Sequence, residues 1–215
     1  MKQTFSEQER GRLDRLIAEV EKRTNTQIVL AVINRSDSYA ELPWKAFALG
    51  ASVAGLAVLI LDLLYVSWYP RFTMLMAGAG ILGCGAALAL LTVLIPGFAR
   101  RFLPASRAEV EVRQYAESLF LSRELFATSN RTGILILVSL FERKVMLLPD
   151  TGLQEFLNEK ILQTIIAAMT PLLKRNEIGQ AFEAGLNRLS HTLGTTVPGT
   201  GENELPDDII EEKGV

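Results

Sequence analysis

The hydropathy pattern of the chain is dominated by two long stretches without charge. Residues 46–61 and 72–99 contain no Asp, Glu, Lys or Arg. A helix needs about 20 consecutive apolar residues to cross a bilayer. The pattern therefore predicts two transmembrane helices, over residues 44–66 and 72–96, with residues 67–71 as the tip of a hairpin. A charged segment comes before the first stretch, which is unlike a signal peptide.

Basic residues are concentrated at one end of the expected hairpin. The tip carries only Arg71, whereas the flanking segments carry Arg35, Lys45, Arg100, Arg101 and Arg107. Because basic residues favour the cytoplasmic side of a membrane, both termini are expected in the cytoplasm. We therefore expect a multi-pass protein of a bacterial inner membrane, with the lipid bilayer as one of its partners.

Asp62 interrupts the first apolar stretch, about one helical turn from the expected tip. An acid inside a membrane span is by default a functional candidate, and a transport role is one interpretation. The other interpretation is an acid at the membrane interface that pairs with Arg71. Neither predicted helix contains a second charge in its apolar part, so a transporter or channel would have little to work with.

Small residues recur at a spacing of four in both apolar stretches. They are Gly50 with Ala54, Ala51 with Gly55, and the series Ala79, Gly83 and Ala87. Faces of this kind permit close contact between helices. Contact within the hairpin is one interpretation, and contact between copies in a homo-oligomer is the alternative.

The segment before the hairpin predicts one helix and one strand. Ser6 followed by Glu9 is a capping box, which marks the start of a helix. The helix has one apolar face, formed by Leu13, Leu16, Ile17 and Val20. Residues 27–33, "QIVLAVI", are apolar without alternation, so they predict a strand that is covered on both faces.

The segment after the hairpin predicts three helices and two strands. The strands cover residues 134–140 and 143–149, with a turn at Phe141–Glu142 that is not a favoured two-residue hairpin pair. The helices are expected over residues 106–125, 153–173 and 177–193. Residues 195–215 are rich in Gly, Pro and acidic side chains, and we expect them to be largely disordered.

A strand that is apolar on both faces needs a layer on each side. Residues 1–43 hold one helix and one strand, so they cannot bury that strand alone. The strands in residues 97–194 have the same need and lie on the same expected side of the membrane. The two segments are therefore expected to form one α/β domain, with at least three strands and helices on both faces, into which the transmembrane hairpin is inserted.

Composition excludes several kinds of function. The chain has 22 Lys and Arg against 24 Asp and Glu, so its charge gives no argument for a nucleic-acid partner. Cys84 is the single Cys and His191 the single His, which leaves little room for a His-based triad or a His-rich metal site. The sequence contains no Walker glycine loop and no Gly-x-Ser-x-Gly motif.

A candidate metal or ligand site follows from the two predicted strands. A hairpin of these strands brings Arg131 and Thr132 near Asp150. Asp37 could join them if the first strand of the chain ran parallel to residues 143–149. Carboxylates with hydroxyl groups suit Ca²⁺ or Mg²⁺, and with Arg131 such a site could serve phosphoryl hydrolysis. The alternative is a structural Arg131–Asp150 pair that closes the hairpin.

A non-enzymatic binding module is the first-ranked hypothesis, because no strong catalytic constellation is visible. The partner would be a membrane-protein client or a subunit at the cytoplasmic surface. Its candidate contacts are the turn residues Glu142 and Arg143 and, in the segment "NELPDD", Asn203, Glu204 and Leu205. The alternative for the charged turn residues is plain solvated surface. A weak divalent-metal-dependent or acid phosphatase at Asp150 is the second-ranked function.

The chain resembles the TPM-domain family in its membrane-inserted branch. The segments that carry the resemblance are "FSEQERGRLDRLIAEVEKRTNTQIVLAVINRSDSY", "RTGILILVSLFERKVMLLPDTGL" and "NELPDD". The resemblance implies a three-layer α/β/α sandwich on a membrane anchor. Relatives are linked to photosystem repair in chloroplasts and to receptor modulation in animals. Some are described as weak acid phosphatases or as binding calcium, which implies the same two alternatives for this chain.

Overall fold

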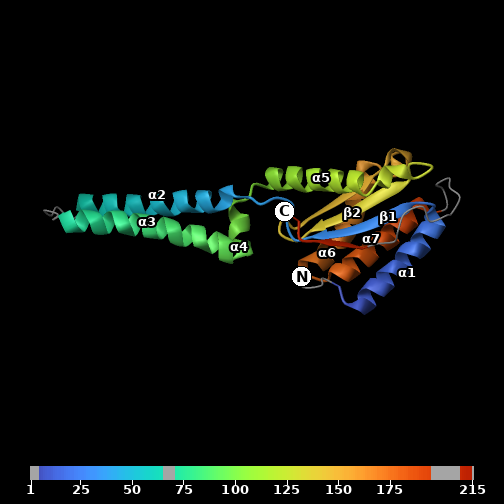
Figure 1. Ribbon diagram of the computed structural model, residues 1–215, viewed down its shortest axis with the longest axis horizontal. Helices are drawn as coiled ribbons and strands as arrows, with labels where there is room; N and C mark the ends of the chain where they lie inside the picture. Colours follow the sequence, from blue (N-terminus) through green and yellow to red (C-terminus); the bar gives the residue numbers. More distant parts are fainter. Residues whose placement is uncertain (1–4, 65–70, 195–208, 215) are drawn as a thin grey trace. The chain divides into compact units, whose positions relative to one another are not determined.

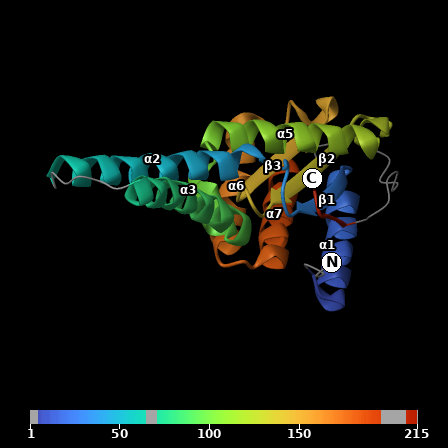
Figure 2. The same ribbon diagram turned by 60° about the vertical axis from the view of Figure 1, so that its left-hand side comes forward.

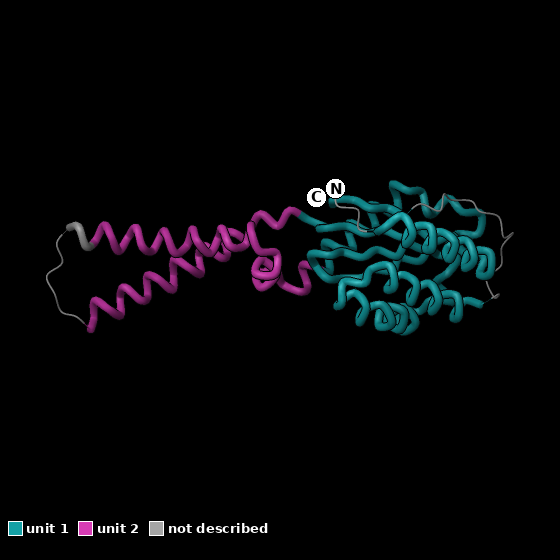
Figure 3. The backbone as a smooth tube through the Cα atoms, turned by 90° about the horizontal axis from the view of Figure 1, so that it is seen from below, with its two compact units in different colours: residues 1–37, 109–215 teal, residues 38–108 magenta. Residues whose placement is uncertain are grey.

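The computed structural model describes residues 5–64, 71–194 and 209–214. The chain folds into two compact units. Unit 1 contains residues 1–37 and 109–215, and unit 2 contains residues 38–108 (Figure 3). Unit 1 is therefore assembled from two segments that are separated in sequence by the whole of unit 2.

A four-stranded sheet is the centre of unit 1. Its order is β3-β2-β1-β4, where β1 and β4 are strands from segments far apart in the sequence (Figure 1). β1 runs parallel to β2 and to β4, whereas β3 runs antiparallel to β2. The strands are Gln27–Ile33 (β1), Gly133–Ser139 (β2), Lys144–Pro149 (β3) and Ile210–Glu212 (β4).

Helices cover both faces of the sheet, and the strands direct alternate side chains to each. Helices α1 (Glu7–Thr24), α6 (Glu159–Lys174) and α7 (Ile178–Leu193) lie on one face, and α5 (Ala105–Ser122) lies on the other (Figures 1 and 2). Buried side chains of β1 join the first layer at Ile28, Leu30 and Val32 and the second at Val29, Ala31 and Ile33. The prediction of an α/β fold with helices on both faces is confirmed.

The first helix forms as its capping box predicts. The Ser6 hydroxyl accepts a hydrogen bond from the Glu9 amide at 3.2 Å, and the Glu9 carboxylate accepts one from the Ser6 amide at 2.9 Å. The hydrogen bond from the Ser6 amide, and then one that the Ser6 hydroxyl donates to the same carboxylate, lower the pKa of Glu9. At the other end, Asn25 adopts a left-handed conformation, with φ of 52°, and closes the helix.

The predicted helix over residues 153–173 is wrong at its start. α6 begins at Glu159, and Asn158 caps it by accepting a hydrogen bond from the Ile161 amide at 3.1 Å. Before it, residues Thr151–Leu153 form a single 3₁₀ turn, η3. Leu153 and Leu157 are buried in this non-helical segment, and their spacing only imitates a helix face. Apolar periodicity therefore cannot locate this boundary, whereas the capping side chain does.

The last strand corrects the expectation of disorder for residues 209–214. Ile210, Glu211 and Glu212 pair with Ala31, Val32 and Ile33 of β1. Ile209 and Ile210 are buried on opposite faces of the sheet. Two adjacent Ile residues anchor the strand although acidic residues surround them in sequence. Residues 195–208 lie outside the part of the chain that the structure describes.

Two long apolar helices form most of unit 2. They are α2 (Glu41–Leu64) and α3 (Arg71–Leu94), and the short elements α4 (Pro96–Ala99) and η1 (Arg100–Phe102) follow them. The segments Glu41–Leu64 and Met74–Leu94 are long and apolar enough to cross a membrane, and very little of either is buried. Length and composition alone support this reading, so insertion into a bilayer stays a prediction.

Two glycines allow α2 and α3 to pack closely. A Cβ added at Gly50 would lie 2.9 Å from the Cys84 carbonyl oxygen, and one added at Gly85 would lie 2.9 Å from the Phe47 ring. The predicted contact face is therefore confirmed at Gly50. The series Ala79, Gly83 and Ala87 is exposed and faces away from α2, so it does not form the contact within the hairpin.

Candidate functional site

Asp150 lies where β3 ends, beside the beginning of β2. Its side chain is buried and accepts two hydrogen bonds from Arg131, from Nε to Oδ2 at 2.7 Å and from Nη2 to Oδ1 at 2.9 Å. The Thr151 amide donates a third to Oδ1 at 2.7 Å. The sheet brings these residues together because Ile134 is paired with Pro149. The expected proximity of Arg131 and Asp150 is therefore observed.

Arg131 is held at this corner by its backbone as well as its side chain. Its φ is 56°, a left-handed conformation that turns the chain into β2. The side chain is 50% exposed and lies beside the Phe126 ring, 5.9 Å from the ring centre. The hydrogen bond to Asp150 raises the pKa of Arg131. The guanidinium is thus a permanent cation with one side open to water.

Gly152 shows how tightly the corner is closed. Its amide donates to the Arg131 carbonyl at 3.0 Å. A Cβ at this position would lie 2.2 Å from the Asn130 carbonyl oxygen. The neighbouring Thr132 is buried, and its carbonyl accepts a hydrogen bond from the Gln27 amide at 3.1 Å. The "DTG" segment is therefore packed directly against the turn that precedes β2.

The hydrogen bonds that the Asp150 carboxylate already accepts limit what it can bind. A carboxylate offers about four lone-pair positions, and three donors already use three of them. A cation at this carboxylate would meet the positive charge of Arg131 and would have to displace it. The arrangement has the form of a structural pair that closes the hairpin.

Asp37 lies at the opposite end of the sheet from Asp150. β1 is parallel to β2, and β2 is antiparallel to β3, so β1 and β3 run in opposite directions. A strand of seven residues spans about 23 Å, which separates the two ends. The condition under which Asp37 would join Arg131, Thr132 and Asp150 is not met. Among the described residues, no group of three or more His, Cys, Asp or Glu is placed to hold a metal ion.

The opposite end of the sheet contains a second buried carboxylate, Glu142. Its Oε1 accepts hydrogen bonds from the Ser36 amide at 3.0 Å and from the Ser36 hydroxyl at 2.7 Å. Its Oε2 accepts one from the Ser139 hydroxyl. The expectation that Glu142 is an exposed partner contact is therefore wrong, whereas Arg143 is exposed. Through these hydrogen bonds, Glu142 connects the turn after β2 to the loop after β1.

The shape of the turn explains why Glu142 is buried. The turn takes four residues, 140–143, and Arg143 closes it with a φ of 53°. The Leu140 and Phe141 amides donate to the carbonyls of Ile33 and Asn34, so this segment still follows β1. Sequence reasoning missed the site. The signal was a serine at or just beyond the end of each of two neighbouring strands, beside a turn acid.

The C-terminal strand forms a third polar cluster. Glu211 pairs with Arg10 of α1. Glu212 accepts a hydrogen bond from the hydroxyl of Tyr115 on α5 at 2.7 Å and one from Nη2 of Arg123, the residue after α5, at 3.1 Å. Burial, and then the hydrogen bond to Glu212, raise the pKa of Tyr115 to about 12. Tyr115, Arg123 and Glu212 border a cavity of about 380 Å³.

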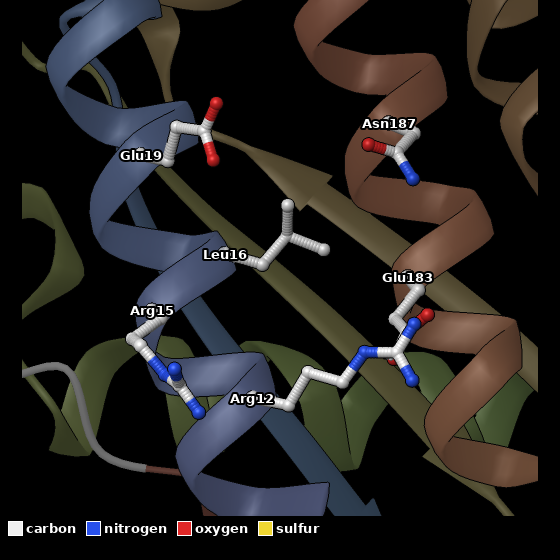
Figure 4. Close-up of a pocket in the computed structure, with 6 residues that line it drawn as sticks. All are labelled: Arg12, Arg15, Leu16, Glu19, Glu183 and Asn187. Atoms are coloured by element: carbon white, nitrogen blue, oxygen red, sulfur yellow. Dashed lines mark ion pairs between the residues drawn. The ribbon is translucent and has the colours of Figure 1, made fainter.

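A groove between α1 and α7 is the other cavity of note in unit 1. Figure 4 shows the lining residues, Arg12, Arg15, Leu16 and Glu19 on α1 and Glu183 and Asn187 on α7, with Arg12 extended toward Glu183. Arg12 Nε lies 2.9 Å from Glu183 Oε1. The volume is about 460 Å³. Two cations and two carboxylates balance each other here, so the groove has no charge preference for a ligand.

The roles expected for Asp62 and for residues 203–205 stay predictions. Asp62 is exposed on α2, and the Arg71 side chain lies outside the description, so their pairing stays a prediction. Asn203, Glu204 and Leu205 also lie in a part of the chain without description.

The chain is similar in part of its sequence to one protein family and in its fold to a solved structure. The family model for the TPM domain matches residues 101–192. The NMR structure of the BA42 protein from the psychrophilic bacterium Bizionia argentinensis has the same fold, with a TM-score of 0.58 and 13% sequence identity, over 98% of this chain and 97% of that one. No curated protein matches the chain. The family match covers most of α5 to α7, whereas β1 and β4 complete the sheet from outside it.

Proposed function

We propose that the chain is a membrane-anchored binding module, and the match of residues 101–192 to the family model for the TPM domain supports this proposal. In this proposal α2 and α3 anchor the chain in a bacterial inner membrane. Unit 1 then holds a membrane-protein client or subunit at the cytoplasmic surface, for assembly or quality control. No catalytic step is needed for such a role.

The exposed apolar surface of unit 2 is the observation that carries the proposal. Large apolar side chains are exposed along both long helices, for example Val53, Leu56 and Leu63 on α2 and Met74, Leu75 and Val93 on α3. An apolar surface of this extent needs a cover of lipid or protein. Each helix has 24 residues, which is enough to span the hydrocarbon core.

Charged residues at one end of unit 2 support the proposed orientation. Lys45, Arg100, Arg101 and Arg107 lie at the ends of the helices that lead back to unit 1. Arg107 Nε lies 3.2 Å from Glu41 Oε1. Trp44, with an exposed fraction of 73%, suits the membrane interface at this end. Both termini would therefore lie in the cytoplasm.

The state of the strand-end carboxylates favours binding over hydrolysis. Asp150 and Glu142 are both buried, and each accepts three hydrogen bonds from groups of unit 1. A phosphatase at Asp150 would have to release Arg131 before a metal ion or a phosphate ester could reach the carboxylate. We therefore keep the metal-dependent or acid phosphatase as the second candidate.

The test is purification of the tagged full-length chain from membranes that have been solubilised in a mild detergent. We expect the chain to resist an alkaline wash of the membranes and to retain a membrane protein in a fixed ratio. Asp150→Ala should retain the same ratio, because Asp150 closes a corner and does not contact the partner. A variant that combines Val53→Lys with Leu56→Lys should lose its retention in the membrane.

Release of the wild-type chain by the alkaline wash would contradict the membrane anchor. A chain that stays in the membrane but retains no other protein in any detergent would contradict the binding role. Loss of the partner in Asp150→Ala, with unit 1 folded, would move the function to the Asp150 corner and favour the second candidate.

A further inference from the structure

We propose that the edge of β1 that carries β4 is a binding groove for an extended acidic peptide. The chain's own residues 209–212 occupy this groove as a resident ligand. A partner presents a segment of the same chemistry, two β-branched apolar residues followed by two acidic residues, and displaces them. This inference rests on the proposed function, because it names the surface through which the module holds its partner.

Apolar anchors give the groove its first element of recognition. Ile209 and Ile210 are only 5% and 6% exposed. Ile209 packs into the layer of α1, α6 and α7, and Ile210 packs into the layer of α5. The groove therefore offers one apolar position on each side of the sheet, as expected where a peptide adds a strand to a sheet edge.

Charge complementarity gives the second element. Side chains of a strand alternate between the two faces, and the two acids of β4 follow this rule. Glu211 meets Arg10 on the α1 side, and Glu212 meets Tyr115 and Arg123 on the α5 side. A peptide with an acid at each position would reproduce both contacts, whereas a basic residue would meet a cation.

The length of the groove is set by a third feature. The Ile28 amide on β1 donates a hydrogen bond to Glu21 Oε1 at 2.6 Å, and this carboxylate is buried. Glu21 therefore closes the first part of the β1 edge with a side chain from α1. Among the described residues of the C-terminal segment, 209–214, strand pairing involves Ala31, Val32 and Ile33 of β1. The groove fits a short peptide and would reject a long strand.

The resident strand is held in a way that allows exchange. Three of the described residues 209–214 pair with β1, and both arginine partners reach water, with exposed fractions of 42% for Arg10 and 48% for Arg123. Ion pairs with this much exposure contribute little to stability. A peptide of matching sequence that is presented at high local concentration at the membrane surface can therefore compete with residues 209–212.

The end of the groove adds a requirement for glycine. Gly214 has a φ of +72°, and a Cβ there would lie 1.7 Å from the Arg35 carbonyl oxygen. A residue with a side chain would therefore meet both a strained backbone and a clash. The preferred peptide carries a glycine two residues after the second acid, as in the segment "IIEEKG" at residues 209–214.

The test measures fluorescence anisotropy of a labelled peptide, IIEEKG, with the full-length chain in detergent. Combining Glu211→Arg with Glu212→Arg brings like charges against Arg10 and Arg123 and releases the resident strand. We expect this released variant to bind the peptide saturably, at least tenfold more tightly than the wild type. The matched control combines Glu117→Arg with Glu155→Arg, two exposed acids away from the groove, and should bind like the wild type.

Two outcomes would overturn the groove. One is equal affinity of the wild type and the released variant for the peptide. The other is equal binding of a peptide in which both acids are replaced by lysine. Dimers of the released variant in light scattering, without peptide binding, would show that the groove serves exchange between copies, which also overturns the partner assignment.

A second variant keeps the test decisive if the double reversal unfolds unit 1. Arg10→Glu should reverse the preference at one position, so that IIKEKG binds this variant at least fivefold more tightly than IIEEKG. No change in preference, with unit 1 folded, would refute the groove. If the groove does not bind the peptide, co-purification of a membrane protein is unaffected. Failure of the proposed function abolishes that co-purification and leaves peptide binding unchanged.

Discussion

The two ends of the central sheet each contain a buried carboxylate, but the groups that donate hydrogen bonds to it differ in charge and exposure. At each end a buried carboxylate ties a turn to a neighbouring strand. Asp150 is held by the cation Arg131, whose side chain is 50% exposed. Glu142 is held by the neutral donors of Ser36 and Ser139, and both serines are buried. One end is an ion pair whose cation reaches water, and the other is a carboxylate held by uncharged, buried donors.

This difference decides which carboxylate matters more for stability. When Asp150 is removed, Arg131 can turn toward solvent and recover its hydration, so the loss is the net value of a partly exposed ion pair together with the hydrogen bond from the Thr151 amide. When Glu142 is removed, the buried donors of Ser36 and Ser139 lose the acceptor that this carboxylate supplies. A buried donor that loses its acceptor costs more than the hydrogen bond itself contributed.

The largest effect is expected from Gly152→Ala at the Asp150 end. The new Cβ would lie 2.2 Å from a backbone oxygen of Asn130, so the corner must open, at a cost of about 3 kcal/mol in the free energy of unfolding. Urea unfolding followed by circular dichroism measures the change. Gly11→Ala is the matched control, because a Cβ there has no neighbour within 4 Å and alanine favours a helix. Equal stability of the two variants would show that the corner is loose.

Glu142→Ala should have the next largest effect. We expect it to lower the free energy of unfolding by about 2 kcal/mol, because the buried donors of Ser36 and Ser139 lose this acceptor. Glu142→Gln keeps one side-chain oxygen as an acceptor and should lose less than half as much. The same unfolding experiment compares the two. A larger loss for glutamine than for alanine would mean that the charge, and not the hydrogen bonding, stabilises this end.

Asp150→Ala should cost less than Glu142→Ala, roughly 1 kcal/mol, since Arg131 returns to water. The loss should shrink at high salt, because the Asp150–Arg131 pair is partly screened in the wild type already. The Glu142 variants should show no salt dependence of their loss. If Asp150→Ala proved the more damaging of the two, the comparison between the ends would be reversed.

The smallest effect concerns Tyr115, beside the C-terminal strand. Its pKa is raised to about 12 by burial and by the hydrogen bond to Glu212. The folded state therefore keeps the phenol neutral at a pH where the unfolded chain ionises it. Its contribution to stability is present below pH 10 and is lost as the pH rises toward 12. Ultraviolet titration should show one late tyrosine that titrates earlier in Glu212→Gln, and an unchanged curve would contradict the contact.

Local sequence signals located the elements whose structure depends on local chemistry. The capping box of Ser6 and Glu9 marks the start of α1, and the apolar run over residues 27–33 coincides with β1. The pairing of Arg131 with Asp150 follows from the hairpin of β2 and β3. Each of these features is determined by residues close in sequence or by one turn.

Features that depend on long-range pairing were not accessible in the same way. β4 contains three residues in an acidic segment, and only its place beside β1 makes it a strand. The position of Asp37 depended on the relative direction of β1 and β3, which no local pattern specifies. The burial of Glu142 required Ser36 and Ser139 to be brought together by the parallel pairing of β1 and β2.

In the function that we propose, the carboxylates of Asp150 and Glu142 are structural, and the chain acts by binding a partner. Calorimetric titration of the full-length protein with Ca²⁺ and then Mg²⁺ tests this most directly, with Asp150→Ala and Glu142→Gln measured beside the wild type. We expect no heat of cation binding from any of the three proteins, because internal hydrogen-bond donors already occupy both carboxylates. Saturable binding by the wild type that is lost in Asp150→Ala would contradict it and would favour the phosphatase.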